Sequence, residues 1–172
     1  MKKLLLAAAA ATVFATPAFA APGDTANADG TATATVIAPI SITHDAGAAL
    51  AFGTIITGTA AGTVTVTTAG SASAGGDAKL AAGSTNSADA FTVDGQANRT
   101  FTISATDGTV DGTSGDALTN GASMSFTTDV AASGTLNASG TTAVAVGGEL
   151  SVGANQDAGD YEGTYNVTVA YN

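Results

Sequence analysis

Apolar and polar residues alternate along the last stretch of the chain, residues 159–172. Because successive side chains of a β-strand point to opposite faces, this stretch has one apolar and one polar face. The apolar face carries Tyr161, Tyr165, Val167, Val169 and Tyr171. The polar face carries Glu162, Thr164, Asn166, Thr168 and Asn172. A strand of this kind either lies inside a complete sheet or offers free backbone groups to the strand of another chain.

Short alternating segments, separated by Gly, Asn and Asp, also fill the rest of the chain after its first 20 residues. The expected strands are 31–43 with an interruption at Pro39, 49–56, 62–68, 90–93, 99–105, 122–128, 142–146, 149–152 and 160–171. Strands of this length at intervals of about 8 to 12 residues are typical of an immunoglobulin-like β-sandwich. The sequence therefore predicts an all-β fold of that type.

Large apolar side chains within these strands are the candidates for the interior of the sandwich. They are Phe52, Ile55, Val64, Val66, Phe91, Val93, Phe101, Ile103, Met124, Phe126, Leu150 and Val152. Residues 69–88 are rich in Ala, Gly and Ser, and we interpret them as a long connection within the domain. Residues 107–121 contain several Asp-Gly and Asn-Gly pairs, which favour turns, so a loop or a decorated hairpin is expected there.

Residues 1–20 have the features of a secretory signal peptide. Two lysines precede an apolar stretch from Leu4 to Phe14, and small residues at the end provide a cleavage site before Ala21. The apolar stretch is shorter than the roughly 20 residues that a membrane-spanning helix needs, so no membrane insertion is expected. The expected parts are a signal peptide (1–20), an N-terminal extension (21–30) and one sandwich domain (31–172).

The chain has 14 acidic residues and 4 basic ones, two of which lie in the signal peptide. Binding to nucleic acid needs a basic patch that neutralises phosphates, and Lys79 and Arg99 alone cannot form one. The same deficit of positive charge argues against binding to anionic membrane surfaces. Because the chain has no cysteine, disulfides and thiolate metal sites are excluded as sources of stability.

Candidate catalytic and metal-binding residues are few. His44 precedes Asp45, but one histidine without cysteines or a second histidine cannot form the usual zinc site, and no nucleophile motif accompanies the pair. Asp107, Asp111 and Asp116 do not have the spacing of a calcium-binding loop. Glu149 and Glu162 show no sign of forming an acid/base pair. The sequence therefore predicts a protein that is not an enzyme and has no cofactor.

Small residues occupy alternate positions before the first expected strand. The segment runs through Asp24, Ala26, Ala28, Gly30, Ala32 and Ala34. A polar tail with small side chains is usually disordered, but alternating small residues can also enter a narrow cleft of a neighbouring molecule as a strand. These residues are therefore candidates for a donated strand.

The C-terminal strand resembles the closing motif of chaperone-usher fimbrial subunits. In that family a glycine lies fourteenth from the end, apolar residues alternate after it, and an aromatic residue is penultimate. The residues that match this pattern are Gly159, Tyr165, Val167, Val169 and Tyr171. The region from residue 31 onward also looks like an uncharacterised bacterial family of secreted Gly- and Thr-rich domains. The segments that carry this likeness are 38–42, 50–55 and 146–156.

The fimbrial resemblance implies an incomplete immunoglobulin-like domain that lacks its last strand. A periplasmic chaperone would hold the domain through the five matching residues, an outer-membrane usher would assemble it, and the N-terminal extension of the next subunit would complete it. The resemblance thus implies a structural subunit of a surface fimbria or pilus, exported to the periplasm and then to the cell surface. The alternatives are a self-complete secreted or surface-attached β-sandwich binding or adhesion module and, third, a secreted hydrolase.

Overall fold

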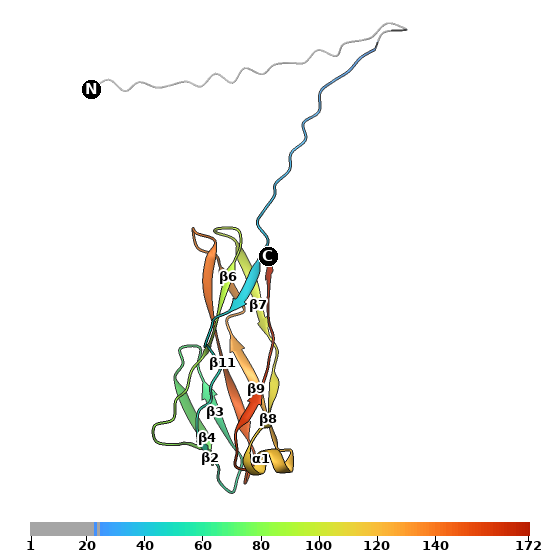
Figure 1. Ribbon diagram of the computed structural model, residues 1–172. Coiled ribbons are helices and arrows are strands. Elements are labelled where there is room, and N and C mark those ends of the chain that lie inside the picture. The colour runs from blue at the N-terminus through green and yellow to red at the C-terminus, as the bar shows by residue number, and fades with distance from the viewer. Residues whose placement is uncertain (1–22, 24) are drawn as a thin grey trace, which may run out of the picture. The chain divides into compact units, whose positions relative to one another are not determined.

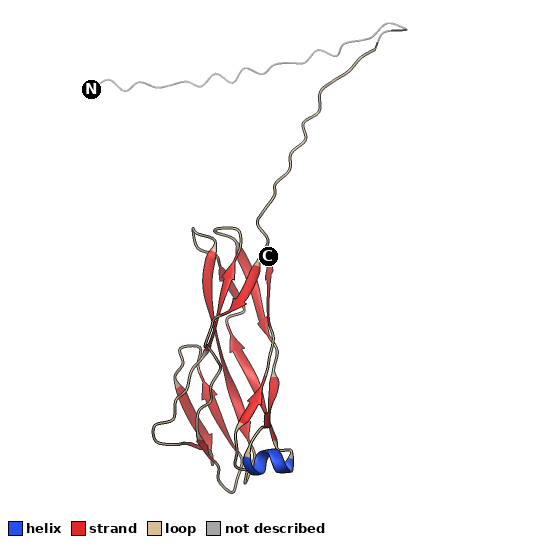
Figure 2. Ribbon diagram, viewed as in Figure 1, coloured by secondary structure: helices blue, strands red, loops and turns tan. Residues whose placement is uncertain are grey.

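The longest strand, β11 (Thr141–Val152), runs through the middle of the fold. The computed structural model describes residue 23 and residues 25–172. Within this part, residues 37–172 form one unit whose regular structure is almost entirely strand, with one short helix (Figures 1 and 2). Along β11 the buried residues Val144, Val146, Leu150 and Val152 lie at alternate positions, as expected for a strand with one face in the core.

The main sheet has eight antiparallel strands. Its principal order is β1 (Ser41–His44), β6 (Asp89–Asp94), β11, β9 (Ser123–Val130), β8 (Gly108–Gly112) and β12 (Tyr161–Gly163). In addition, β3 (Gly62–Val66) pairs with β11 and with β4 (Ala72–Gly76). Along β11, residues 141–146 pair with β6, whereas residues 148–152 pair with β3. The sheet therefore has two ends that share β11.

Smaller sheets form the second layer. At one end the sheet is β10 (Ser133–Thr135), β7 (Thr100–Ala105) and β13 (Val167–Tyr171). At the other end it is β2 (Ile55–Ile56) with β5 (Lys79–Leu80). This arrangement of antiparallel sheets confirms the prediction of an all-β sandwich.

The core is divided into two clusters, one for each end. The "closed end" contains Val93, Phe101, Ile103, Leu136 and Val144. The "open end" contains Val64, Ala78, Met124, Phe126, Leu150 and Val152. Nine of the twelve side chains predicted to be interior are buried, all but Val66 within these clusters, and Phe52, Ile55 and Phe91 pack against the clusters while partly exposed.

Several strand boundaries differ from the predictions. The strand expected over residues 31–43 is limited to β1, because Pro39 cannot donate to a ladder. The two strands expected around Gly147 and Gly148 form one strand, β11. Added Cβ atoms at these glycines would collide with backbone atoms of Val66 and Thr127, so the glycines allow the strands to approach closely. The strand expected over residues 160–171 is divided into β12 and β13.

The two stretches without predicted strands both contain regular structure. Residues 69–88 include β4 and β5. Residues 107–121 form β8 and the helix α1 (Gly115–Asn120), which ends at Gly121 in the left-handed conformation. Residues 25–36 contain no helix or strand, and their side chains are exposed. None of the described helices is long and apolar enough to cross a membrane.

Candidate functional site

The C-terminal strand β13 has one paired and one free edge. The carbonyl of Asn166 accepts a hydrogen bond from Thr106 N, and Asn172 N donates to the carbonyl of Thr100. Backbone N–H and C=O groups alternate in direction along a strand. Those of the even-numbered residues of β13 therefore point toward β7, and those of the odd-numbered residues point away from it. No strand in the described part of the chain pairs with that outer edge. The backbone groups of Val167, Val169 and Tyr171 therefore form a free edge.

Strand β1 has a free edge of the same kind. Asp45 N donates to the carbonyl of Ala90, so residues 41, 43 and 45 face β6. The backbone groups of Ile42 and His44 then point away from β6, and the described residues supply no strand to pair with them. The edges of β1 and β13 lie opposite one another, with some Cα atoms within 8 Å. We call the gap between these two edges the slot.

At the open end an apolar groove of about 1100 Å³ lies over the main sheet. Residues 48–55 and 57, which follow β1, and residues 156–165, which precede β13, both line it. Large side chains that line it include Phe52, Val110, Met124, Phe126, Leu150 and Val152. The groove is thus lined by the stretch that follows β1 and the stretch that precedes β13, the two strands that border the slot.

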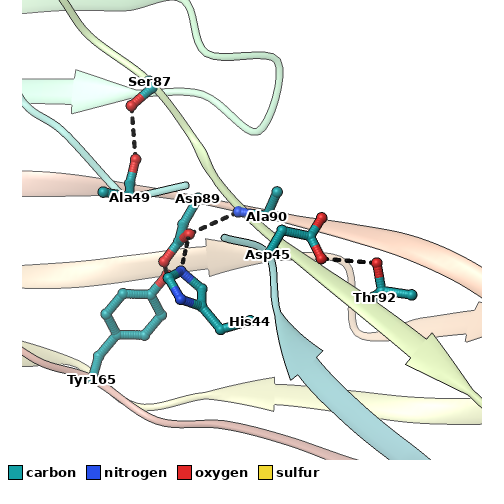
Figure 3. A network of polar contacts seen from close by, with 8 residues as sticks. All are labelled: His44, Asp45, Ala49, Ser87, Asp89, Ala90, Thr92 and Tyr165. Carbon is teal, nitrogen blue, oxygen red and sulfur yellow. Dashed lines mark hydrogen bonds and ion pairs between the residues drawn. The ribbon is translucent and has the colours of Figure 1, made fainter. Parts of the chain in front are cut away.

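A buried carboxylate in the lining of the groove connects the end of β1 to the stretch before β13 (Figure 3). Asp89 is 5% exposed, and its Oδ1 accepts hydrogen bonds from His44 Nε2 at 2.7 Å and Ala90 N at 2.8 Å. Its Oδ2 accepts one from the Tyr165 hydroxyl at 2.6 Å. His44 ends β1, whereas Tyr165 precedes β13. Burial and this hydrogen bond raise the pKa of Tyr165 far above its usual value, so its hydroxyl remains a donor.

A second tyrosine makes polar contacts at the far end of β13. The Tyr171 hydroxyl accepts a hydrogen bond from Gln96 N at 2.6 Å and donates one to the carbonyl of Ala38 at 3.0 Å. Ala38 lies just before β1, and Gln96 follows β6. The penultimate residue therefore joins the C-terminal strand to the first segment of the sandwich.

The five residues predicted to bind a chaperone or another subunit lie along one continuous stretch. Gly159 and Tyr165 line the groove, and Val167, Val169 and Tyr171 form the apolar face of β13 against the closed end. A Cβ at Gly159 would collide with the carbonyl oxygen of Ser114, so only glycine allows this close approach to the start of α1.

The candidate donor residues Ala26, Ala28, Gly30, Ala32 and Ala34 are exposed and outside any strand. Asp24 and the predicted signal peptide lie outside the described residues.

The sequence reasoning missed Asp89 and considered the wrong partner for His44. Asp45 bonds to Thr92 instead, at 2.8 Å (Figure 3). Asp89 shares a strand face with the apolar residues Phe91 and Val93, so an acid at an inward-facing position was the available signal. Its partners are 45 and 76 residues away in the chain. That separation is why no local motif identified them.

Residues 40–171 match the model of the family described as Domain of unknown function (DUF4402). The chain belongs to this family. No curated protein matches the chain. No solved structure matches it either.

In this DUF4402 protein the described site presents backbone groups and apolar side chains around one carboxylate that is already hydrogen-bonded. His44 and Tyr165 each bond to the Asp89 carboxylate, and most of the remaining lining is apolar. Within the described residues, no three His, Cys, Asp or Glu side chains gather in a way that could hold a metal ion. The groove and slot together present apolar side chains flanked by two rows of free backbone groups.

Proposed function

We propose that this DUF4402 protein is a structural subunit of a bacterial surface fimbria or pilus, and that a strand from a partner completes its sandwich. The observation that carries the proposal is the slot, where two free strand edges face each other beside an open apolar groove. Unpaired edges invite pairing with another chain, so a fold that keeps two of them opposite one another is suited to accept a strand.

An extended peptide satisfies this site better than a small molecule does. The free edges require a partner with backbone donors and acceptors at regular spacing, and the groove requires apolar side chains at alternate positions. A β-strand supplies both at once. The resemblance of residues 159–171 to the fimbrial closing motif supports the same conclusion.

The N-terminal segment of a second copy is the proposed occupant in the polymer. Residues 25–36 are exposed, contain no strand and carry alternating small side chains that suit a narrow slot. As an extended strand these residues would span about 40 Å, at about 3.3 Å per residue, which is longer than the five-residue strand β13. Before assembly, a strand of a periplasmic chaperone would take the same place, and an outer-membrane usher would exchange it.

The proposal is tested with protein sheared from the surface of producing cells. An unheated sample in detergent should give a ladder of multimers on a denaturing gel, and boiling should reduce the ladder to one band. Because the chain has no cysteine, such a ladder reports a noncovalent polymer. The variant Ala32→Asp, on the apolar face of the donor segment, should remove the ladder. Thr33→Asp, one residue further and on the opposite face, is the matched control.

A single monomer band before and after boiling, from folded exported protein, would contradict the fimbrial role. It would favour a self-complete binding or adhesion module. Insertion of residues 25–36 into the slot of their own chain would also give a monomer. Loss of the folded state in Ala32→Asp would then identify that case, because a self-complete module does not need the segment.

A further inference from the structure

The slot is too narrow for an additional strand in the structure as it stands. Neighbouring strands lie about 4.8 Å apart, so a strand between β1 and β13 would hold their axes about 9.6 Å apart. Some Cα atoms of β1 and β13 are within 8 Å of each other. The groove at the open end, in contrast, already has a volume of about 1100 Å³. Entry of a strand along the whole site therefore requires β13 to move away from β1.

Hydrogen bonds from two tyrosines oppose this movement, one at each end of β13. Tyr171 joins β13 to Ala38 and Gln96. Tyr165, just before β13, is joined through Asp89 to His44 at the end of β1. The Asp89 carboxylate is buried, so a bond broken there is replaced less readily by water than a bond at the surface.

We propose that Tyr165 and Tyr171 are latches that hold the slot shut until a strand arrives. This inference rests on the proposed function for the identity of the occupant, but the closed slot itself is a property of the single subunit. A strand would enter at the preformed groove and would separate β13 from β1 as it advances past Asp89 toward Tyr171. The latches would thus limit the rate of strand entry and protect the free edges from unrelated chains.

Conservative variants isolate the latch bonds. Tyr165→Phe and Tyr171→Phe keep the aromatic rings, which for Tyr165 pack against Phe91 and Phe126, and remove only the hydroxyls. Thr102→Val is the matched control, because Thr102 Oγ1 bonds to the carbonyl of Ala170 on β13 without crossing the slot. Loss of this hydrogen bond weakens the attachment of β13 to β7 and leaves both latches in place.

The width of the slot can be measured directly in the monomeric fraction of the full exported chain. The chain has no cysteine, so Thr43→Cys on β1 and Ala170→Cys on β13, both exposed positions, accept a pair of spin labels. The distance distribution should be narrow in the parent protein and in Thr102→Val. In the Tyr165→Phe/Tyr171→Phe double variant it should broaden and shift to longer distances. Each single variant should give an intermediate result, which keeps the test valid if the double variant does not fold.

A second measurement uses a fluorescent peptide with the sequence of residues 25–36 as the entering strand. Each Tyr→Phe variant should increase its association rate by about tenfold, which corresponds to about 1.4 kcal/mol of barrier. An unchanged distance distribution in folded variants would overturn the latch proposal, whatever the association rate of the peptide. A slot that widens without binding the peptide would support the latches and would count against the proposed occupant instead.

Discussion

The closed and open ends share the main sheet but differ in what covers it. At the closed end a three-stranded sheet forms the second layer, and Val93, Phe101 and Leu136 are at most 1% exposed. At the open end the second layer is the two-residue strands β2 and β5, and Phe52 and Tyr165 remain partly exposed. One apolar sheet face thus has a complete cover at one end only.

The two ends therefore differ in how much apolar surface the described chain itself covers. The closed end buries large side chains within the chain and can stabilise the subunit alone. The open end leaves apolar surface in contact with water, and an occupant that covers it gains the free energy of that burial. In the proposed fimbrial role, the subunit would therefore stay folded, and its open end would still gain free energy when the next strand binds.

The largest expected effect comes from a charge on the apolar face of β13. Val169→Asp places a carboxylate against the cluster that includes Phe101 and Ile103, which destabilises the fold by an amount on the order of 3 kcal/mol and blocks pairing in the slot. We expect no accumulation of the exported protein, measured by immunoblot of periplasmic extracts. Thr168→Asp, exposed on the same strand, should accumulate normally. Equal accumulation of the two variants would show that this face recognises no chaperone.

A smaller effect should distinguish the two cores. Phe101 is fully buried at the closed end, so Phe101→Ala should destabilise the monomer by about 3–5 kcal/mol in urea unfolding. Phe126 is buried but lines the groove, and water can enter the space that Phe126→Ala creates. We expect a loss about half as large. If Phe126→Ala cost as much as Phe101→Ala, the open end would be a complete core rather than an acceptor.

The strand pattern of the sequence was sufficient for the fold class, because alternation depends on local residues. It identified the apolar face of β13 and most of the core, including Phe101 and Phe126. It missed α1 and merged β12 with β13, because Gly- and Asp-rich stretches permit turns, strands and short helices alike.

The contacts across the slot were beyond the reach of the sequence pattern. Tyr165 and Asp89 are 76 residues apart, and Tyr171 and Ala38 are 133 apart. Their meeting depends on the order of strands in two sheets. The alternation within β13 also could not show that its neighbour is β7 on one edge and no strand of the described chain on the other.

The smallest expected effect concerns the latch at Asp89 and appears only at high pH. Burial and the hydrogen bond to Asp89 raise the pKa of Tyr165, whereas in the unfolded chain a tyrosine ionises near pH 10. The folded state therefore retains a proton that the unfolded state loses, so this contribution to stability is intact below about pH 10 and decreases as the pH rises further. Tyr165→Phe removes the ionisable group, and its free energy of unfolding should decrease less steeply above pH 10 than that of the parent protein. Urea unfolding at a series of alkaline pH values, with phenolate absorbance recorded alongside, measures both slopes. Parallel slopes would mean that the Tyr165 hydroxyl ionises freely in the folded protein and that the bond between the two sides of the slot is weak.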